Sequence, residues 1–241
     1  MVANGVQIHS PNQKDLMVLF KKIIENQETQ LDSFAKLLVT FITQYKSTGK
    51  CNNSLGFKSL YIQNESNPPY RRERTSKFLS IAEKVYVQYQ EFLSKNGQID
   101  FEDMINNACK ALQSDFNKFE LKTQYDSYKY IIIDEYQDIS SQRMDLIRLI
   151  LSKSHAKLFC VGDDWQSIYR FSGADLTNIL YFRKDFPDCE QMNLAYTYRY
   201  SQELSNTAAN FIQQNPNQIK KTIISKKSCL KPVNIVETYG D

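Results

Sequence analysis

Two neighbouring carboxylates, Asp134 and Glu135, follow directly after an apolar run at residues 130–133. Because side chains alternate between the two faces of a strand, consecutive acids at its end point in different directions. One can face a metal ion while the other faces a water molecule. Buried parallel strands are apolar runs, and ligands of open α/β sheets collect beyond their carboxyl ends. The pair predicts a hydrolytic site there, with loop solvation or helix capping as the alternative.

A second apolar run, residues 158–161, also ends in acids. Between the two runs, helical spacing of four apolar residues predicts a helix; they are Met144, Ile147, Ile150 and Leu151. Strands and helices that alternate from about residue 128 predict an α/β fold. Beyond the second run the chain reads GDDWQSIYRFSGA at 162–174, and LAYTYRYS follows at 194–201.

These ordered stretches resemble motifs of superfamily 1 DNA helicases of the UvrD/Rep type. Residues 130–138 resemble motif II, residues 162–174 resemble motif III, and residues 194–201 resemble the motif that opens the second motor domain. The second stretch is most similar to the helicase IV branch. The resemblance implies an incomplete P-loop NTPase (RecA-like) parallel sheet. It also implies an ATP-dependent motor that uses ATP and Mg²⁺, moves 3′ to 5′ on single-stranded DNA and separates duplex DNA.

The resemblance assigns roles around the nucleotide. Asp134 is expected to hold Mg²⁺ through water, and Glu135 to orient and deprotonate the attacking water. Gln166 matches the glutamine that senses the γ-phosphate, since an amide both donates and accepts hydrogen bonds; a turn-stabilising amide is the alternative. Arg199 matches the arginine that reaches across the domain cleft to the γ-phosphate. Tyr198 matches the tyrosine that stacks on adenine, with a core tyrosine as the alternative.

Two aromatic residues are implied contacts for single-stranded DNA. Tyr169 and Phe171 fall where the family places aromatic rings against bases, and stacking of this kind is independent of base sequence. The chain departs from the family pattern at two positions. Phe171 stands where many relatives have tryptophan, which preserves a stacking face. Ser172 stands where many have a second arginine, which puts one charged contact in doubt.

The chain contains no G-x-x-x-x-G-K-[ST] loop, although a superfamily 1 motor needs this loop to hold the triphosphate. Residues 47–50 end in Gly49 and Lys50, but Gln44 occupies the first glycine position and Cys51 follows the lysine. A helical pattern precedes them where the motif requires a strand, so we interpret Gly49 as a helix cap. The late helicase motifs are also missing. We therefore expect a fragment of a larger helicase that is inactive alone.

The predicted organisation has three parts. Residues 1–125 are expected to form a helical accessory subdomain inserted in the first motor domain, residues 126–194 part of that RecA-like domain, and residues 195–241 the start of the second motor domain. Apolar spacing predicts helices at 16–24, 31–45 and 78–92. The helix at 78–92 is predicted to end at Asn96-Gly97. Asp100 is then the predicted N-cap of a further helix, whose buried stripe is Met104, Ile105, Ala108 and Leu112. A strand is predicted at 190–194, followed by a helix from Ser201 that buries Leu204, Ala208, Phe211 and Ile212.

Residues 50–76 are predicted to be a long polar loop. A basic cluster lies in and beside it: Arg71, Arg72, Arg74 and Lys77. Contact with a DNA backbone and a solvated helix start are both open interpretations, because phosphates attract such side chains without regard to sequence.

The amino-acid composition limits which other classes of protein the chain could belong to. The 241 residues are 41% hydrophobic and 24% charged, ordinary values for a globular protein, and the formal charge of +3 permits DNA binding without requiring it. Five cysteines without C-x-x-C spacing indicate neither a disulfide framework nor a zinc site. No apolar run suits a membrane and no signal peptide is evident, so we expect a cytoplasmic protein. A helicase-nuclease, or a truncated DNA- or partner-binding protein without catalysis, remains an alternative.

Overall fold

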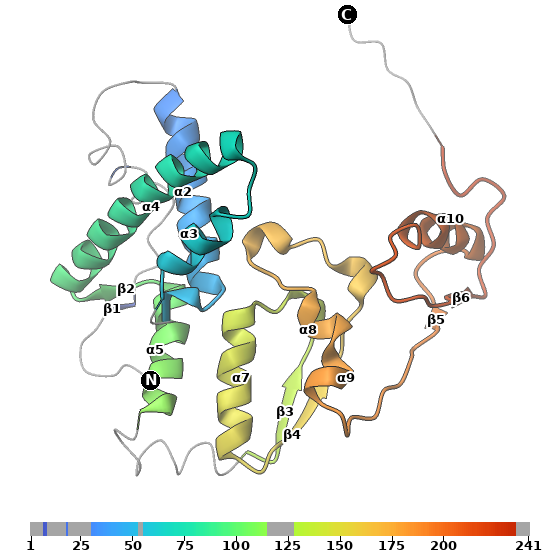
Figure 1. Cartoon of the computed structure of the whole chain (residues 1–241). Helices are drawn as coiled ribbons and strands as arrows, with labels where there is room; N and C mark the ends of the chain where they lie inside the picture. Colours follow the sequence, from blue (N-terminus) through green and yellow to red (C-terminus); the bar gives the residue numbers. More distant parts are fainter. Residues whose placement is uncertain (1–6, 9–17, 19–29, 53–54, 115–127, 235–241) are drawn as a thin grey trace, which may run out of the picture.

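A computed structural model describes residues 7–8, 18, 30–52, 55–114 and 128–234 of the chain. The fold over these residues is mixed α/β, mostly helical, with short parallel sheets of two strands each (Figure 1). The strand pairs are β1 with β2, β3 with β4, and β5 with β6.

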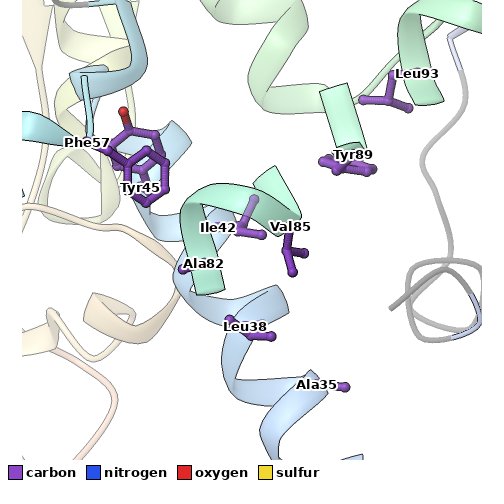
Figure 2. Packing of buried hydrophobic residues seen from close by; sticks show 9 residues of the cluster. All are labelled: Ala35, Leu38, Ile42, Tyr45, Phe57, Ala82, Val85, Tyr89 and Leu93. Carbon is purple, nitrogen blue, oxygen red and sulfur yellow. The ribbon is translucent and has the colours of Figure 1, made fainter. Parts of the chain in front are cut away.

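The N-terminal part is helical. Its elements are α2 (Gln30–Ser47), the 3-10 turn η1 (Lys50–Asn52), α3 (Lys58–Asn64), α4 (Pro69–Lys95) and α5 (Phe101–Gln113). β1 (Gln7–Ile8) pairs in parallel with β2 (Gln98–Ile99). Figure 2 shows the core where α2 packs on α4; its buried members are Ala35, Leu38, Ile42, Tyr45, Phe57, Ala82, Val85, Tyr89 and Leu93. Burial of these apolar side chains is the main stabilising contribution to this part.

The predicted helix ends are confirmed. Gly49 follows α2 with φ +69°, a left-handed conformation that suits glycine at a helix C-terminus. Asn96 caps α4 and Gly97 follows with φ +62°. Asp100 is the N-cap of α5, because its Oδ1 accepts a hydrogen bond from the Asp103 amide at 2.7 Å. Lys50 begins η1 after a helix, so it does not close a phosphate loop.

One prediction for this part is wrong, and another is only partly confirmed. Residues 50–76 are not a long loop, since they contain η1, α3 and the first turns of α4. The basic cluster lies on exposed first turns of α4, as the helix-start interpretation expected. The predicted α5 stripe is partly confirmed: Leu112 is buried and Ile105 and Ala108 are half-buried, but Met104 is exposed, and Asn106 and Cys109 are buried as well. The difference arises because α5 packs between α2 and α7, and the Asn106 amide donates to the carbonyl of Lys46.

The central part is built around β3 (Tyr130–Ile133) and β4 (Lys157–Cys160), which pair in parallel with Ile133 opposite Cys160. The predicted connecting helix is α7 (Ser141–Lys153), which packs on α5. Short elements complete this part: η2 (Tyr136–Asp138), η3 (Asp164–Gln166), η4 (Arg170–Ser172), α8 (Thr177–Leu180) and α9 (Phe182–Asp185).

The expectation of fully buried strands is wrong for the described residues. Ile132 and Phe159 are 71% and 58% exposed, whereas Ile133 and Cys160 on the other face pack against the cluster of Tyr136 and Met144. A parallel sheet is covered on both faces only when helices or further strands pack on each. Here the described elements cover one face.

The C-terminal part contains α10 (Gln202–Ile212) and the parallel pair β5 (Tyr196–Thr197) and β6 (Ile224–Ser225). The helix predicted from Ser201 is confirmed, with the Ser201 hydroxyl accepting from the Leu204 amide at 3.3 Å. Its predicted inner face is partly wrong, because Ala208 and Phe211 are exposed and Ser205 is buried.

The strand predicted at 190–194 is also wrong. These residues form no strand, and Met192 and Leu194 are exposed; the strand begins two residues later, where β6 supplies a partner. The helix predicted at 16–24 lies outside the described residues except for Val18, which is helical. None of the described helices combines the length and the apolar character needed to cross a membrane.

Candidate nucleotide and DNA site

The carboxyl ends of β3 and β4 lie side by side. The Val161 amide donates to the carbonyl of Ile133 at 2.8 Å, and the Tyr136 amide donates back to the carbonyl of Val161 at 2.8 Å. The first bond closes the end of the parallel ladder, and the second joins Tyr136 to Val161 beyond the two acids. They bring the loop at residues 134–138 against the loop at residues 162–166, so the polar groups of both stretches share one edge of the sheet.

Asp134 and Glu135 are exposed at this edge. The Glu135 amide donates to Oδ1 of Asp134 at 2.9 Å. Glu135 has φ 49° and ψ 46°, and among the described residues it is the one non-glycine residue with positive φ. Such a conformation costs about 1 to 3 kcal/mol and persists where the surroundings hold it, often at functional sites.

Gln137 joins the two loops. Its side chain is buried, its Nε2 donates to Oε2 of Glu135 at 2.7 Å, and its Oε1 accepts from the Asp163 amide at 2.9 Å. The Ser167 hydroxyl also donates to the Gln137 carbonyl at 3.4 Å. One neutral amide therefore fixes the Glu135 carboxylate relative to the start of the second loop.

Gly162 lets the loops approach this closely. A Cβ at this position would lie 2.9 Å from Oε1 of Gln137 and 3.1 Å from Cβ of Tyr136. Tyr136 cannot retreat easily, because its ring is buried against Phe182 and its hydroxyl contacts Sδ of Met144 at 3.2 Å. The absence of a side chain at Gly162 is therefore a packing requirement of the site.

This edge of the sheet carries several acidic side chains. Burial, followed by the nearby charge of Glu135, raises the pKa of Asp138 above its ordinary value. The donor set suits a hard cation, because Asp134 offers carboxylate oxygen at an exposed position. Among the described residues no group of three or more His, Cys, Asp or Glu side chains gathers to hold a metal ion. Mg²⁺ bound by one carboxylate, water and phosphate oxygens needs no such group.

Gln166 lies in the second loop, exposed, with its Nε2 donating to Oδ2 of Asp163 at 2.7 Å. Asp163 also accepts from the Trp165 amide at 3.0 Å, as the N-cap of η3. Gln166 is thus linked through Asp163 to Gln137, and through Gln137 to Glu135. The structure thus connects two predicted residues, Glu135 and Gln166, through two others, Gln137 and Asp163.

Tyr169 and Phe171 form an exposed aromatic pair. They are 46% and 67% exposed, and their ring centroids are 5.9 Å apart. The turn that carries them is held by α2, because Nε2 of Gln44 donates to the carbonyl of Phe171 at 2.9 Å. Gly173, with φ +97°, touches α2 so closely that a Cβ there would overlap the hydroxyl of Ser47. Helix α2 therefore holds the turn that carries both rings.

Tyr198 and Arg199 are placed apart from these groups. Both are exposed just after β5, and the Arg199 amide donates to Oγ1 of Thr197 at 3.4 Å. No hydrogen bond or ion pair within the described part of the chain joins their side chains to Glu135 or Gln166. The core position considered for Tyr198 is wrong, because its side chain is 71% exposed.

Four residues of this region were assigned no role from the sequence: Gln137, Gly162, Asp163 and Lys221. Gln137, Gly162 and Asp163 lie inside the recognised stretches, and their sequence signal was their place beside the acids. Lys221 contacts Asp163 and Asp164 from a position 57 residues further along the chain than Asp164. No local pattern marks it, because the contact exists only after folding.

Fold and site together define a mixed α/β protein whose acids and amides meet at the carboxyl ends of two adjacent parallel strands. Residues 4–187 match the family described as UvrD/REP helicase N-terminal domain, and the chain belongs to this family. The resemblance read from the three motif stretches is therefore confirmed.

Named relatives agree with this assignment. The chain is 36% identical over 162 residues to a DNA helicase IV of Escherichia coli (strain K12), a match covering 66% of this chain and 22% of that protein. It is 30% identical over 230 residues to a probable DNA helicase II homolog of Rickettsia conorii, covering 94% of this chain and 32% of that protein. An ATP-dependent DNA helicase PcrA of Staphylococcus aureus is 34% identical over 167 residues, covering 66% and 22%. The chain thus spans 22 to 32% of these relatives.

Proposed function

We propose that this chain supplies the water-activating and coupling groups of an ATP-driven motor that moves along single-stranded DNA and separates duplex DNA. The observation that carries the proposal is the link from Glu135 through Gln137 to Asp163 and Gln166. It connects an exposed carboxylate at the end of β3 to an exposed amide after β4. A motor needs such a connection, because the state of the nucleotide must be communicated to the groups that hold DNA.

Asp134 and Glu135 would have different roles at the nucleotide. Asp134 would hold Mg²⁺ through water, and the ion would neutralise phosphate charge when bound. Glu135 would accept the proton of the attacking water, since its carboxylate is exposed and is held by the Gln137 amide. Gln166 would sense the γ-phosphate by exchanging its bond to Asp163 for one to phosphate oxygen. We assign ATP as the nucleotide from the family and from the names of the relatives.

Tyr198 and Arg199 would complete the nucleotide site from the other side. An exposed tyrosine can stack on adenine, and an exposed arginine can reach the γ-phosphate when the C-terminal part closes on the central part. Their separation from Glu135 in this structure is consistent with an open arrangement. An arginine in that role contributes about a thousandfold or more to the rate.

The exposed pair Tyr169 and Phe171 would stack on bases of single-stranded DNA. Each stacked base contributes about 1 to 3 kcal/mol. The basic first turns of α4 offer a second contact, to the phosphate backbone, because Arg71, Arg72 and Arg74 are exposed there. We assign the three parts as before: residues 1–125 as an accessory subdomain, residues 126–194 as part of a RecA-like first motor domain, and residues 195–241 as the start of the second.

The 241-residue chain should not hydrolyse ATP by itself, because its sequence contains no G-x-x-x-x-G-K-[ST] loop. Turnover is measured on the purified chain with Mg²⁺, with and without single-stranded DNA. Magnesium-dependent hydrolysis that persists through purification would contradict the proposal.

The role of Glu135 is tested in a complete motor that carries this chain. Glu135→Gln should remove DNA-stimulated ATP hydrolysis and leave nucleotide binding nearly unchanged, because the amide keeps its shape but cannot accept the proton. Glu190→Gln is the matched control, since Glu190 is exposed and lies outside the linked loops. Turnover retained by Glu135→Gln would overturn the assignment.

The DNA contact is tested on the chain itself. We expect Phe171→Ala to weaken binding of a fluorescent oligothymidylate about fivefold or more, the loss of one stacked base. Tyr181→Ala is the control, because Tyr181 is also an exposed aromatic residue but lies on the α8–α9 connection. Equal affinity for both variants in fluorescence anisotropy would refute stacking at Phe171.

A further inference from the structure

The segment ahead of β6 is clamped to the loop after β4. Nζ of Lys221 forms ion pairs with Asp163 and with Oδ1 of Asp164, the latter at 2.7 Å. The Ile219 amide donates to Oδ2 of Asp164 at 2.8 Å, and Nε1 of Trp165 donates to the carbonyl of Ile219 at 3.0 Å. In Figure 1 the red segment between α10 and β6 accordingly comes beside the gold turn that follows β4. Asp163, Asp164 and Trp165 of the loop after β4 thus contact two residues ahead of β6, Ile219 and Lys221.

The burial of Asp164 makes Lys221 the central member of this contact. The Asp164 side chain is 1% exposed, and a buried carboxylate requires a charge partner and hydrogen bonds to offset its lost hydration. The Lys221 ammonium supplies the charge, and the Ile219 amide supplies a hydrogen bond. The same ammonium lies 4.7 Å from the centroid of the Trp165 ring, a favourable distance for a cation–π interaction.

The carboxylate of Asp163 connects Lys221 to Gln166. Its Oδ1 meets Lys221 and the Trp165 amide, while its Oδ2 accepts from Nε2 of Gln166. Burial alone would raise the pKa of Asp163, but the hydrogen bonds from Lys221 and Gln166 outweigh it and hold that pKa below its ordinary value. The carboxylate is therefore charged and shared between a lysine of the C-terminal part and an amide of the central part.

We propose that Lys221 is a positioning residue: it couples the segment ahead of β6 to the orientation of the Gln166 amide through the shared carboxylate of Asp163. A displacement of the C-terminal part moves the ammonium, and Asp163 then releases or reorients Gln166. The importance of this coupling for ATP turnover rests on the function proposed above for Gln166. The clamp, by which we mean the contacts of Ile219 and Lys221 with residues 163–165, does not depend on that proposed function, because these contacts lie within this chain.

Trp165 allows a direct test, because it is the chain's single tryptophan and its ring lies against Lys221. Emission maximum and acrylamide quenching are measured on the 241-residue chain without ATP or DNA. Lys221→Met should shift emission to the red and raise the quenching constant about twofold, since the ammonium over the ring and the neighbouring segment are released. Lys221→Arg should stay close to the parent protein. Lys220→Met is the control, because Lys220 is exposed.

The link to Gln166 is read from its side-chain amide resonance in protein labelled with ¹⁵N-glutamine, assigned by its loss in Gln166→Asn. The resonance should shift in Lys221→Met and not in Lys220→Met. Should Lys221→Met lose its circular dichroism, Asp163→Asn is measured in the same way. It removes one of the two negative charges that hold Lys221 and leaves buried Asp164 paired, so quenching should rise above that of the parent but less than expected for Lys221→Met. Unchanged quenching overturns the clamp, and an unmoved Gln166 resonance overturns the coupling. Neither readout involves ATP or DNA, so both stand apart from failure of the proposed function.

Discussion

Gly162→Ala tests how the site is assembled, because the glycine separates two loops that have no room for another carbon atom. The new Cβ would lie 2.9 Å from Oε1 of Gln137, 3.1 Å from Cβ of Tyr136 and 3.2 Å from the backbone nitrogen of Gln137. The Gln137 side chain cannot swing away freely, since both ends of its amide are bonded, to Glu135 and to the Asp163 amide.

The cost follows from these contacts. Overpacking a tight site costs about 1 to 3 kcal/mol. Breaking the hydrogen bond between Gln137 and the Asp163 amide adds about 0.5 to 1.5 kcal/mol. We therefore expect Gly162→Ala to lower the free energy of unfolding by about 2 to 4 kcal/mol.

Urea denaturation of the 241-residue chain, followed by Trp165 fluorescence and by circular dichroism, measures the change. Gly97→Ala is the control, because Gly97 has φ +62° but nothing within 4 Å of its added Cβ. Its expected cost is conformational, about 1 kcal/mol.

A double-mutant cycle isolates the clash. In a Gln137→Ala background, Gly162→Ala should cost less than in the parent, because the nearest obstructing atom is gone. A loss below about 0.5 kcal/mol for the single variant, the size of an ordinary surface substitution, would refute the packing requirement.

Three further outcomes are expected. Burial raises the pKa of Cys160 to about 12, so at neutral pH its alkylation, followed by mass spectrometry, should be at least about tenfold slower than that of exposed Cys229; equal rates would contradict the burial. Lys46 is buried 2.5 Å from Asp100, so Lys46→Met should destabilise the chain by about 3 to 5 kcal/mol in urea denaturation, and a change under 1 kcal/mol would show that the pair is not desolvated. Because the pKa of Asp163 is depressed in the folded chain below its ordinary 3.8, its charge stabilises the fold above that value and ceases to do so as pH falls through the folded pKa. The stability difference between the parent and Asp163→Asn should therefore be present at neutral pH and vanish in acid, and a difference that grows on acidification would reverse the assigned sign.

Local patterns in the sequence predicted several elements well. The helix at 31–45, the N-caps at Asp100 and Ser201 and the glycine at position 49 depend on short-range rules of periodicity and capping, and all were found. The apolar runs before Asp134 and Asp163 were found as a parallel pair, since chain order and composition both indicate a strand, helix and strand unit.

Burial was predicted less well, because it depends on what packs from outside the segment. Met104 and Phe211 have helical spacing on apolar faces, yet both are exposed where no described element covers them. The strand expected at 190–194 formed only where β6 supplied hydrogen-bond partners, at 196–197. Residues 50–76 have a polar composition typical of a loop, but α3 and α4 form there, and Asn64 is buried with its amide donating to the hydroxyl of Ser76.

The sequence by itself determined the family and the identities of the candidate acids, amide and aromatic rings, because the motif stretches are contiguous and their order is specific. Tertiary structure alone decided how those groups are connected. Gln137 holds Glu135 and the Asp163 amide together, α2 positions Phe171, and Lys221 reaches Asp163 and Asp164 from far along the chain. These contacts follow from the parallel pairing of β3 and β4 and the packing of separate segments, and no local spacing rule encodes them.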